Sequence, residues 1–178
     1  GGTGNSAALI KYFIKKKLTN GIICKLEKKI GTDLRIFLNS QSFQKNLRQV
    51  FFRKEKIRLN FLLVYPYISC STKDIYSKVR NYNLGSKINF HLIKNKNVLL
   101  TKITSEKNDL QKIVEKKFLK IKKLIDFLSA QEKCVLSRLT GSGSACYGVF
   151  KSEKSAKVAL IKVKKRFPRY WCVTTKTI

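Results

Sequence analysis

The sequence contains few of the residues that mark disordered, fibrous or membrane-spanning chains. Only two prolines and nine glycines occur among its 178 residues, and 43% of the residues are hydrophobic. This composition excludes a collagen-like or low-complexity chain and leaves enough apolar side chains for a packed core. There is no run of about 18 or more apolar residues, so the sequence predicts no transmembrane helix. The first residues also lack the charged start and apolar core of a signal peptide.

Residues that bind transition metals are scarce and scattered. His91 is the sole histidine, and the five cysteines form no C-x-x-C pair. The spacing therefore argues against a zinc site, and we expect no metal bound by the chain itself. An odd number of distant cysteines favours reduced, buried thiols in a cytoplasmic protein.

Acidic residues are also scarce. Ten Asp and Glu face 39 Lys and Arg, which gives a formal net charge of +29 at pH 7. Such a field attracts nucleic acid, anionic lipid or phosphorylated ligands. Most of the excess is lysine, spread over several predicted helix faces, and a bias in coding-sequence composition explains it equally well. The charge alone leaves a nucleic-acid partner open.

Two glycine-rich segments stand out against this background. The first opens the chain as Gly1-Gly2-Thr3-Gly4-Asn5-Ser6, and the second reads Thr140-Gly141-Ser142-Gly143-Ser144. Glycines allow positive φ angles and let bare N–H groups approach a ligand closely. At the start of a helix such N–H groups suit a phosphate. Each segment predicts a loop that binds an anion, with an ordinary turn as the alternative.

Hydrophobic periodicity predicts a mixed chain. In the first third it predicts a helix over 6–18 capped by Asn5 or Ser6, a helix over 22–30 and a strand over 34–38, and it leaves 39–58 poorly patterned and basic. The later part reads as a strand over 58–65, a helix from Ser71 or Thr72 to about 79, a loop over 81–97 and one long helix over 110–128. Strands over 134–139 and 146–150, a helix over 156–165 capped by Ser152, and a final strand from 170 follow. This order indicates an α+β fold with a split-βαβ, ferredoxin-like second half.

The two glycine segments, and Asp33 in the sequence Gly31-Thr32-Asp33-Leu34 between them, resemble the galactokinase–homoserine kinase–mevalonate kinase–phosphomevalonate kinase superfamily. The likeness extends to the stretch from Val64-Tyr65-Pro66 to Tyr76 and to Asn108-Asp109-Leu110 before a long helix. It implies two domains. Residues 1–57 would be the remnant of an N-terminal ATP-binding kinase domain of the ribosomal-protein-S5-domain-2-like type, and residues 58–178 a ferredoxin-like C-terminal kinase domain.

The resemblance also implies an activity and its residues. A kinase of this type would transfer a phosphoryl group from ATP, accompanied by Mg²⁺, to the 2-hydroxyl of the small molecule 4-diphosphocytidyl-2-C-methyl-D-erythritol, in non-mevalonate isoprenoid biosynthesis. Asp33 would be the catalytic base. The ATP-binding residues would be Gly1, Gly2, Gly4, Asn5 and Ser6, and the loop closing over the substrate or nucleotide phosphates would comprise Thr140, Gly141, Ser142, Gly143 and Ser144.

Two alternatives to an active kinase remain at this point. The first glycine segment is shorter than in the superfamily, a glycine-glutamate turn is not found over 41–56, and the superfamily's lysine-bearing N-terminal segment is not in the sequence. These departures favour an inactive remnant, or a chain completed by an N-terminal segment or partner chain, and they predict little turnover by this chain alone. The net charge favours a basic nucleic-acid-binding protein.

Overall fold

The computed structural model describes residues 2–14, 18–39, 41–46, 49–53, 56–80 and 89–177. The chain divides into two compact units. The first unit comprises residues 1–56 and 87–94, and the second comprises residues 57–86 and 95–177. Within the described residues, no helix has the length and apolar character needed to cross a membrane.

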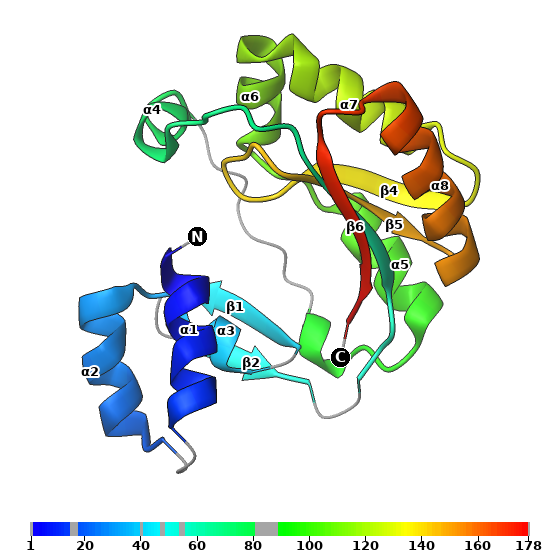
Figure 1. The fold of residues 1–178 in the computed structure, drawn as a ribbon. Helices are drawn as coiled ribbons and strands as arrows, with labels where there is room; N and C mark the ends of the chain where they lie inside the picture. The colour runs from blue at the N-terminus through cyan, green and yellow to red at the C-terminus, as the bar shows by residue number, and fades with distance from the viewer. Residues whose placement is uncertain are drawn as a thin grey trace. The chain divides into compact units, whose positions relative to one another are not determined.

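Three helices form the first part of unit 1 (Figure 1). They are α1 (Gly2–Phe13), α2 (Asn20–Ile30) and α3 (Leu34–Leu38). The Thr19 side chain caps α2 by accepting a hydrogen bond from the Ile22 amide, and Gly31 ends α2 with a φ of 136°. A backbone angle of this kind favours glycine. Arg35 of α3 donates to both carboxylate oxygens of Glu27 on α2, at 3.1 and 3.0 Å, and so ties the two helices together.

A strand pair completes unit 1. Strands β1 (Ser42–Asn46) and β2 (Gln49–Phe52) pair antiparallel, with Phe43 opposite Phe51. Phe43 packs on Phe90 of the short 3₁₀ helix η1 (Phe90–Leu92), and the His91 ring stacks on Phe51 at 4.3 Å. The pair therefore forms its apolar contacts with residues about forty positions further along the chain.

Unit 2 is built on a four-stranded antiparallel sheet. Its strands are β3 (Asn60–Tyr65), β4 (Cys134–Leu139), β5 (Cys146–Phe150) and β6 (Trp171–Lys176). They lie in the order β4-β5-β3-β6, so the first and third strands of the unit occupy the centre. Antiparallel pairing in this order, with helices in the two crossovers, is the split-βαβ, ferredoxin-like arrangement that the sequence predicts.

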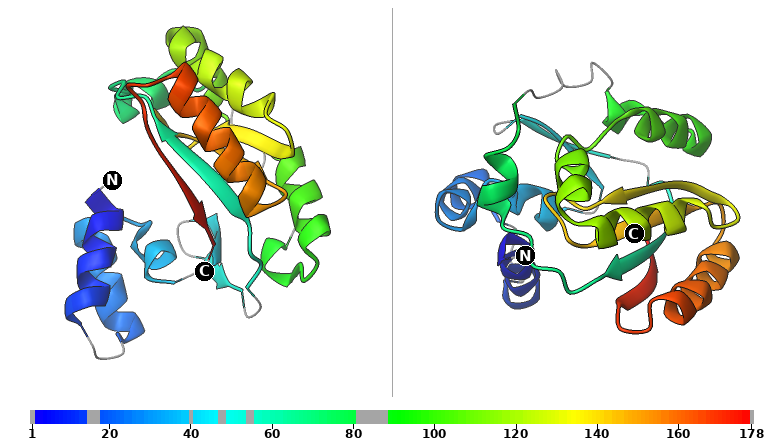
Figure 2. Two further views of the ribbon diagram at one scale, coloured as in Figure 1. Left: turned by 45° about the vertical axis from the view of Figure 1, so that its right-hand side comes forward. Right: turned by 90° about the horizontal axis from the view of Figure 1, so that it is seen from above.

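Between β3 and β4 the chain forms α4 (Thr72–Tyr76), α5 (Lys96–Ser105), α6 (Gln111–Lys117) and α7 (Leu119–Ser129), and α8 (Glu153–Arg166) follows β5. Helices α7 and α8 cover one face of the sheet (Figure 2). Alternate residues of a strand share a face, and Leu62 and Val64 of β3 lie with Phe150 of β5 in the core beneath α7 and α8. Ser152 caps α8 by accepting from the Ser155 amide, as expected.

Helix α5 is held on the other side of β4. Leu139 lies in the core, so its neighbour Arg138 belongs to the opposite face. The Arg138 guanidinium donates to the carbonyls of Ile103 and Thr104, at 2.7 and 3.0 Å. A cation at the C-terminal end of a helix satisfies carbonyls that have no partner within the helix and complements the helix dipole.

Several predicted elements differ from the structure. The apolar run 34–38 is the helix α3 and not a strand, and a strand pair does form within 39–58. Helix α5 lies partly in the predicted loop over 81–97, of which residues 81–88 fall outside the described residues. The predicted long helix over 110–128 is interrupted at Phe118, whose backbone leaves the helical region at φ −128° and ψ 85°.

Candidate functional site

The second glycine segment forms a tight turn between β4 and β5 in unit 2. The Thr140 amide donates to the Ala145 carbonyl at 2.9 Å, and the Gly143 amide donates to the Thr140 carbonyl at 2.8 Å. Gly141 has a φ of 49° and Gly143 a φ of 94°. A side chain at Gly143 would also meet Leu139, because an added Cβ would lie 3.1 Å from Leu139 Cδ1. The turn therefore requires its glycines.

Hydroxyl groups line this glycine loop, which we define as residues 140–144. The Ser142 hydroxyl lies 3.0 Å from the Thr72 hydroxyl at the start of α4. Ser144 is only 3% exposed, and its hydroxyl has no hydrogen-bond partner among the described residues. A buried polar atom without a partner is costly, and its presence in a glycine-rich turn is consistent with a ligand contact at this place.

Two amide side chains from the start of α6 hold the base of the glycine loop. Asn108 donates from Nδ2 to the carbonyls of Leu139 and Gly141, at 3.1 and 2.9 Å. Gln111 accepts from the Leu139 amide at 3.2 Å. Segments about thirty residues apart in sequence are thereby joined by side chain to backbone hydrogen bonds.

The thiols near the glycine loop are unreactive in character. Burial raises the pKa of Cys146, which begins β5, to about 12, and burial also raises the pKa of Cys70. All five cysteines are free thiols. Because only the thiolate is a strong nucleophile, Cys146 acts as a small apolar core residue.

Asp33 lies in unit 1, in the turn between α2 and α3. Its side chain is exposed and makes no capping hydrogen bond to α3, although Asp33 occupies the N-cap position. Its backbone carbonyl accepts from the Ile36 amide at 3.1 Å. Of the two structural alternatives to a catalytic role, a capping aspartate is not what the structure shows, and a turn aspartate agrees with this position.

The first glycine segment lies beside the same turn, but it is not a loop. Gly2, Gly4, Asn5 and Ser6 all belong to helix α1, so the prediction that Asn5 or Ser6 caps a helix beginning at residue 6 is wrong; Gly1 lies outside the described residues. Thr3 donates to the Ile30 carbonyl at 3.4 Å, and an added Cβ on Gly31 would lie 3.0 Å from the Thr3 hydroxyl. The structure therefore brings the beginning of α1 and the Asp33 turn together within unit 1.

The sequence predicts a helix from Ser71 or Thr72, and Asn108 and Asp109 stand directly before another predicted helix. The structure shows Ser71 as the cap of α4, which leaves the Thr72 hydroxyl for Ser142. Asn108 does begin a helix, since its Oδ1 accepts from the Leu110 amide at 3.0 Å, but it also holds the glycine loop. No local signal separates these roles, because the partners lie far away in the sequence.

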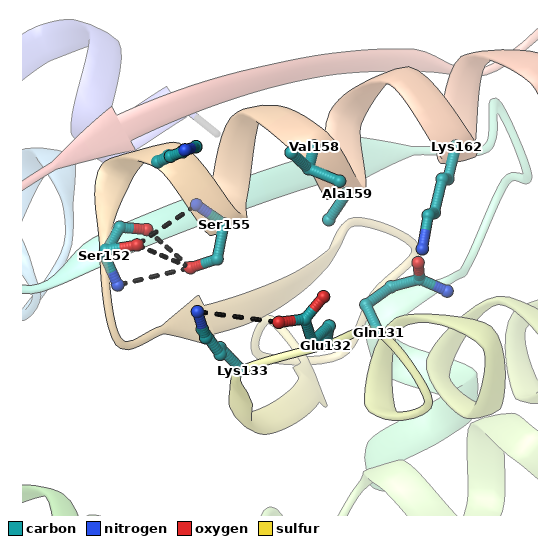
Figure 3. Close-up of a pocket in the computed structure, with 9 residues that line it drawn as sticks. Gln131, Glu132, Lys133, Ser152, Ser155, Val158, Ala159 and Lys162 are labelled. Carbon is teal, nitrogen blue, oxygen red and sulfur yellow. Dashed lines mark hydrogen bonds and ion pairs between the residues drawn. The ribbon is translucent and has the colours of Figure 1, made fainter.

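Cavities elsewhere in unit 2 do not make a better site. One of about 250 Å³ lies at the start of α8, where lysines suggest an anion (Figure 3). There the Ser152 and Ser155 side chains already satisfy the exposed amides through a capping box, and Lys133 pairs with Glu132 at 3.5 Å. A second cavity of about 460 Å³ is lined by Asn108, Gln111 and Arg138, which already hydrogen-bond backbone groups, and Gln111 also donates to the Glu115 carboxylate at 2.7 Å.

Comparison with known proteins identifies the class of unit 2. Residues 92–169 match the family model described as GHMP kinases C terminal. Two solved structures share the fold over 98% of this chain: a 4-(cytidine 5'-diphospho)-2C-methyl-D-erythritol kinase, with a TM-score of 0.69 and 16% identity, and the homoserine kinase from Cytophaga hutchinsonii, with a TM-score of 0.65 and 13% identity. The chain covers 63% and 65% of those structures. Over residues 92–169 the chain thus resembles the C-terminal domain of GHMP kinases.

Curated relatives make the likeness more particular. The chain is 32% identical to the 4-diphosphocytidyl-2-C-methyl-D-erythritol kinase of Pelagibacter ubique over 100% of its own length and 64% of the relative's. It is 32% identical to the kinase of the same name from Buchnera aphidicola, over 88% of this chain and 51% of that relative. The chain thus resembles these kinases over 88% to 100% of its own length and spans 64% or less of theirs.

Proposed function

We propose that this protein is an ATP-dependent kinase that phosphorylates the 2-hydroxyl of 4-diphosphocytidyl-2-C-methyl-D-erythritol, a step of non-mevalonate isoprenoid biosynthesis. The observation that supports it most directly is the glycine loop, a turn with two positive-φ glycines and a buried hydroxyl without a partner, in a fold shared with kinases of that name. The likeness to a curated relative of the same name, over 100% of this chain and 64% of the relative, supports the same substrate.

In this proposal Asp33 acts on the acceptor. The attacking hydroxyl must lose its proton as it bonds to the γ-phosphorus, and a positioned carboxylate accepts that proton. The exposed Asp33 side chain, which makes no capping hydrogen bond, suits this role. The rest of the rate enhancement in phosphoryl transfer comes from alignment and from stabilisation of charge on the transferred group.

Phosphate binding is assigned to the two glycine segments. Gly1, Gly2, Gly4, Asn5 and Ser6 are assigned to the ATP phosphates. The first four N–H groups of a helix have no partner within it, and they lie at the positive end of its dipole. The glycine loop, Thr140, Gly141, Ser142, Gly143 and Ser144, would contribute amides and hydroxyls to a phosphate of the substrate or nucleotide.

The residues present fit a metal that arrives with the nucleotide. Among the described residues, no group of three or more His, Cys, Asp and Glu could hold a metal ion by itself. Mg²⁺ commonly keeps several waters and binds through one or two carboxylates together with substrate phosphates. When bound, Mg²⁺ would neutralise charge on the phosphates. Asp33 is the carboxylate that we assign nearest to the metal and the phosphates.

The kinase is favoured over the alternatives. The relatives reported above carry the kinase's name, and neither an inactive remnant nor a basic nucleic-acid-binding protein is supported by them. The lysine excess is accordingly assigned to composition. Free thiols throughout the chain are consistent with a reducing, cytoplasmic location, which we include in the proposal.

The test is phosphorylation of 4-diphosphocytidyl-2-C-methyl-D-erythritol by the purified protein with ATP and Mg²⁺. We expect turnover in the unmodified protein and a loss of about 10²- to 10⁴-fold in kcat for Asp33→Asn, the usual size of a general-base contribution. ATP should raise the melting temperature of both proteins, because a ligand that binds only the folded state stabilises it.

Asp126→Asn is the matched control. Asp126 is an exposed carboxylate on α7 that pairs with Lys122 at 2.7 Å, so the same chemical change there should leave kcat unaltered. A folded protein that shows neither turnover nor stabilisation by ATP at millimolar concentration would refute the proposed function. Equal losses in both variants would refute the role of Asp33.

A further inference from the structure

The glycine loop closes on itself without using the carbonyl of Gly141 or that of Leu139, the residue directly before the loop. Its internal hydrogen bonds join Thr140 to Ala145 and Gly143 to Thr140. The carbonyls of Leu139 and Gly141 take no part in these bonds, and Gly141 at φ 49° has open space beside its α-carbon. A glycine with this freedom can rotate its peptide planes unless another group fixes them.

Asn108 is the group that fixes them. Its Nδ2 donates at 3.1 and 2.9 Å to the Leu139 and Gly141 carbonyls, while its Oδ1 accepts from the Leu110 amide at 3.0 Å. The amide side chain is therefore held on both sides, by the start of α6 and by the loop. Gln111, three residues further on, accepts from the Leu139 amide at 3.2 Å. Leu139 is therefore bonded at its carbonyl by Asn108 and at its amide by Gln111.

The direction of one backbone N–H follows from this arrangement. In a planar trans peptide the C=O and the N–H of the next residue point in opposite directions. Because the Gly141 carbonyl points at Asn108, the Ser142 N–H points away from it. Neither internal hydrogen bond of the loop uses the Ser142 N–H. The Ser142 side chain, at 3.0 Å from the Thr72 hydroxyl, is fixed separately.

We propose that Asn108 is a positioning residue of the glycine loop: by binding the Gly141 carbonyl it aims the Ser142 N–H outward as a donor to a phosphate oxygen. The proposal rests on the proposed function for the identity of the ligand. The hold of Asn108 on the loop concerns the free protein and is testable without any ligand.

Asn108→Asp isolates this role. Aspartate keeps the oxygen that accepts from the Leu110 amide and caps helices as well as asparagine does, but it has no N–H to give to the loop. Hydrogen exchange of the peptide covering 140–145 in N108D should become about tenfold faster. This factor is expected when the closed form of the loop loses about 1.4 kcal/mol of free energy relative to its open form. The KM for the phosphate ligand held by the loop should rise by a similar factor, with a smaller change in kcat.

Ser152→Ala serves as the control. It removes the cap of α8, a helix that makes no hydrogen bond to the glycine loop among the bonds described above, so it should lower stability and leave KM and loop exchange unchanged. Unchanged loop exchange in N108D, or faster exchange with an unchanged KM for both substrates, would overturn the proposal. If the unmodified protein has no kinase activity, the proposed function fails, and loop exchange in N108D still decides whether Asn108 holds the loop.

Discussion

At the scale of single residues, the two glycines of the loop are not equivalent. Gly141 has a left-handed φ of 49° with nothing within 4 Å of an added Cβ, whereas Gly143, at φ 94°, would bring that atom to 3.1 Å from Leu139 and 3.4 Å from the Cys70 sulfur. The first glycine is required by the backbone alone. The second is required by the backbone and by packing against the core.

This difference predicts two different losses of stability. Gly141→Ala should lower the free energy of unfolding by about 1 kcal/mol, and Gly143→Ala by about 2–3 kcal/mol, because the second also displaces neighbours. Urea denaturation of both variants measures the two losses. Equal losses would contradict the packing argument.

At the scale of elements, the start of α8 shows how a local sequence fixes a boundary. The side chains of Ser152 and Ser155 satisfy each other's backbone amides, and Glu153 places a negative charge in the first turn. Ala156, Ala159 and Val163 then face the sheet and are buried. Capping and apolar spacing agree, so this helix was predictable from its own residues.

Removal of this cap has a defined cost. Ser152→Ala should lower the free energy of unfolding by about 1 kcal/mol, since one helix amide loses its acceptor. Thermal unfolding followed by circular dichroism provides the measurement. Ser129→Ala, at the last residue of α7, is the comparison, and we expect a change of less than about 0.5 kcal/mol there, as for most surface positions. A loss at Ser129 as large as at Ser152 would remove the capping explanation.

At the scale of the whole molecule, the net charge of +29 opposes folding. Compacting a chain with this charge brings like charges together, and few carboxylates compensate. Some of those described form ion pairs, such as Asp74 with Lys117 and Glu153 with Lys157. Salt shortens the range of this repulsion to about 8 Å at physiological ionic strength.

Stability should therefore rise with salt. We expect the melting temperature to increase by several degrees between about 10 mM and about 150 mM sodium chloride, the range over which the Debye length falls from about 30 to about 8 Å. A parallel series with sucrose, which carries no charge, separates screening from general solute effects. A melting temperature that falls over the same range would show that attractive pairs outweigh the repulsion.

The sequence by itself determined the features that depend on neighbouring residues. The spacing of apolar residues and the turn chemistry gave the strands β3, β4, β5 and β6 and the helix α8, and hence the mixed α+β class. Gly31 as the end of α2 and the glycine turn after β4 were also visible, because a positive φ leaves a local signature in residue type.

Only the tertiary structure decided the features whose partners are distant. The short apolar run 34–38 fits a helix or a strand, and contact with α1 and α2 makes it helical. Strands β1 and β2 find their apolar partners in Phe90 and His91, and Asn108 finds its carbonyl partners in Leu139 and Gly141. An asparagine before a helix reads as a cap in any sequence, and its hold on the glycine loop exists only because the fold brings β4 to the start of α6.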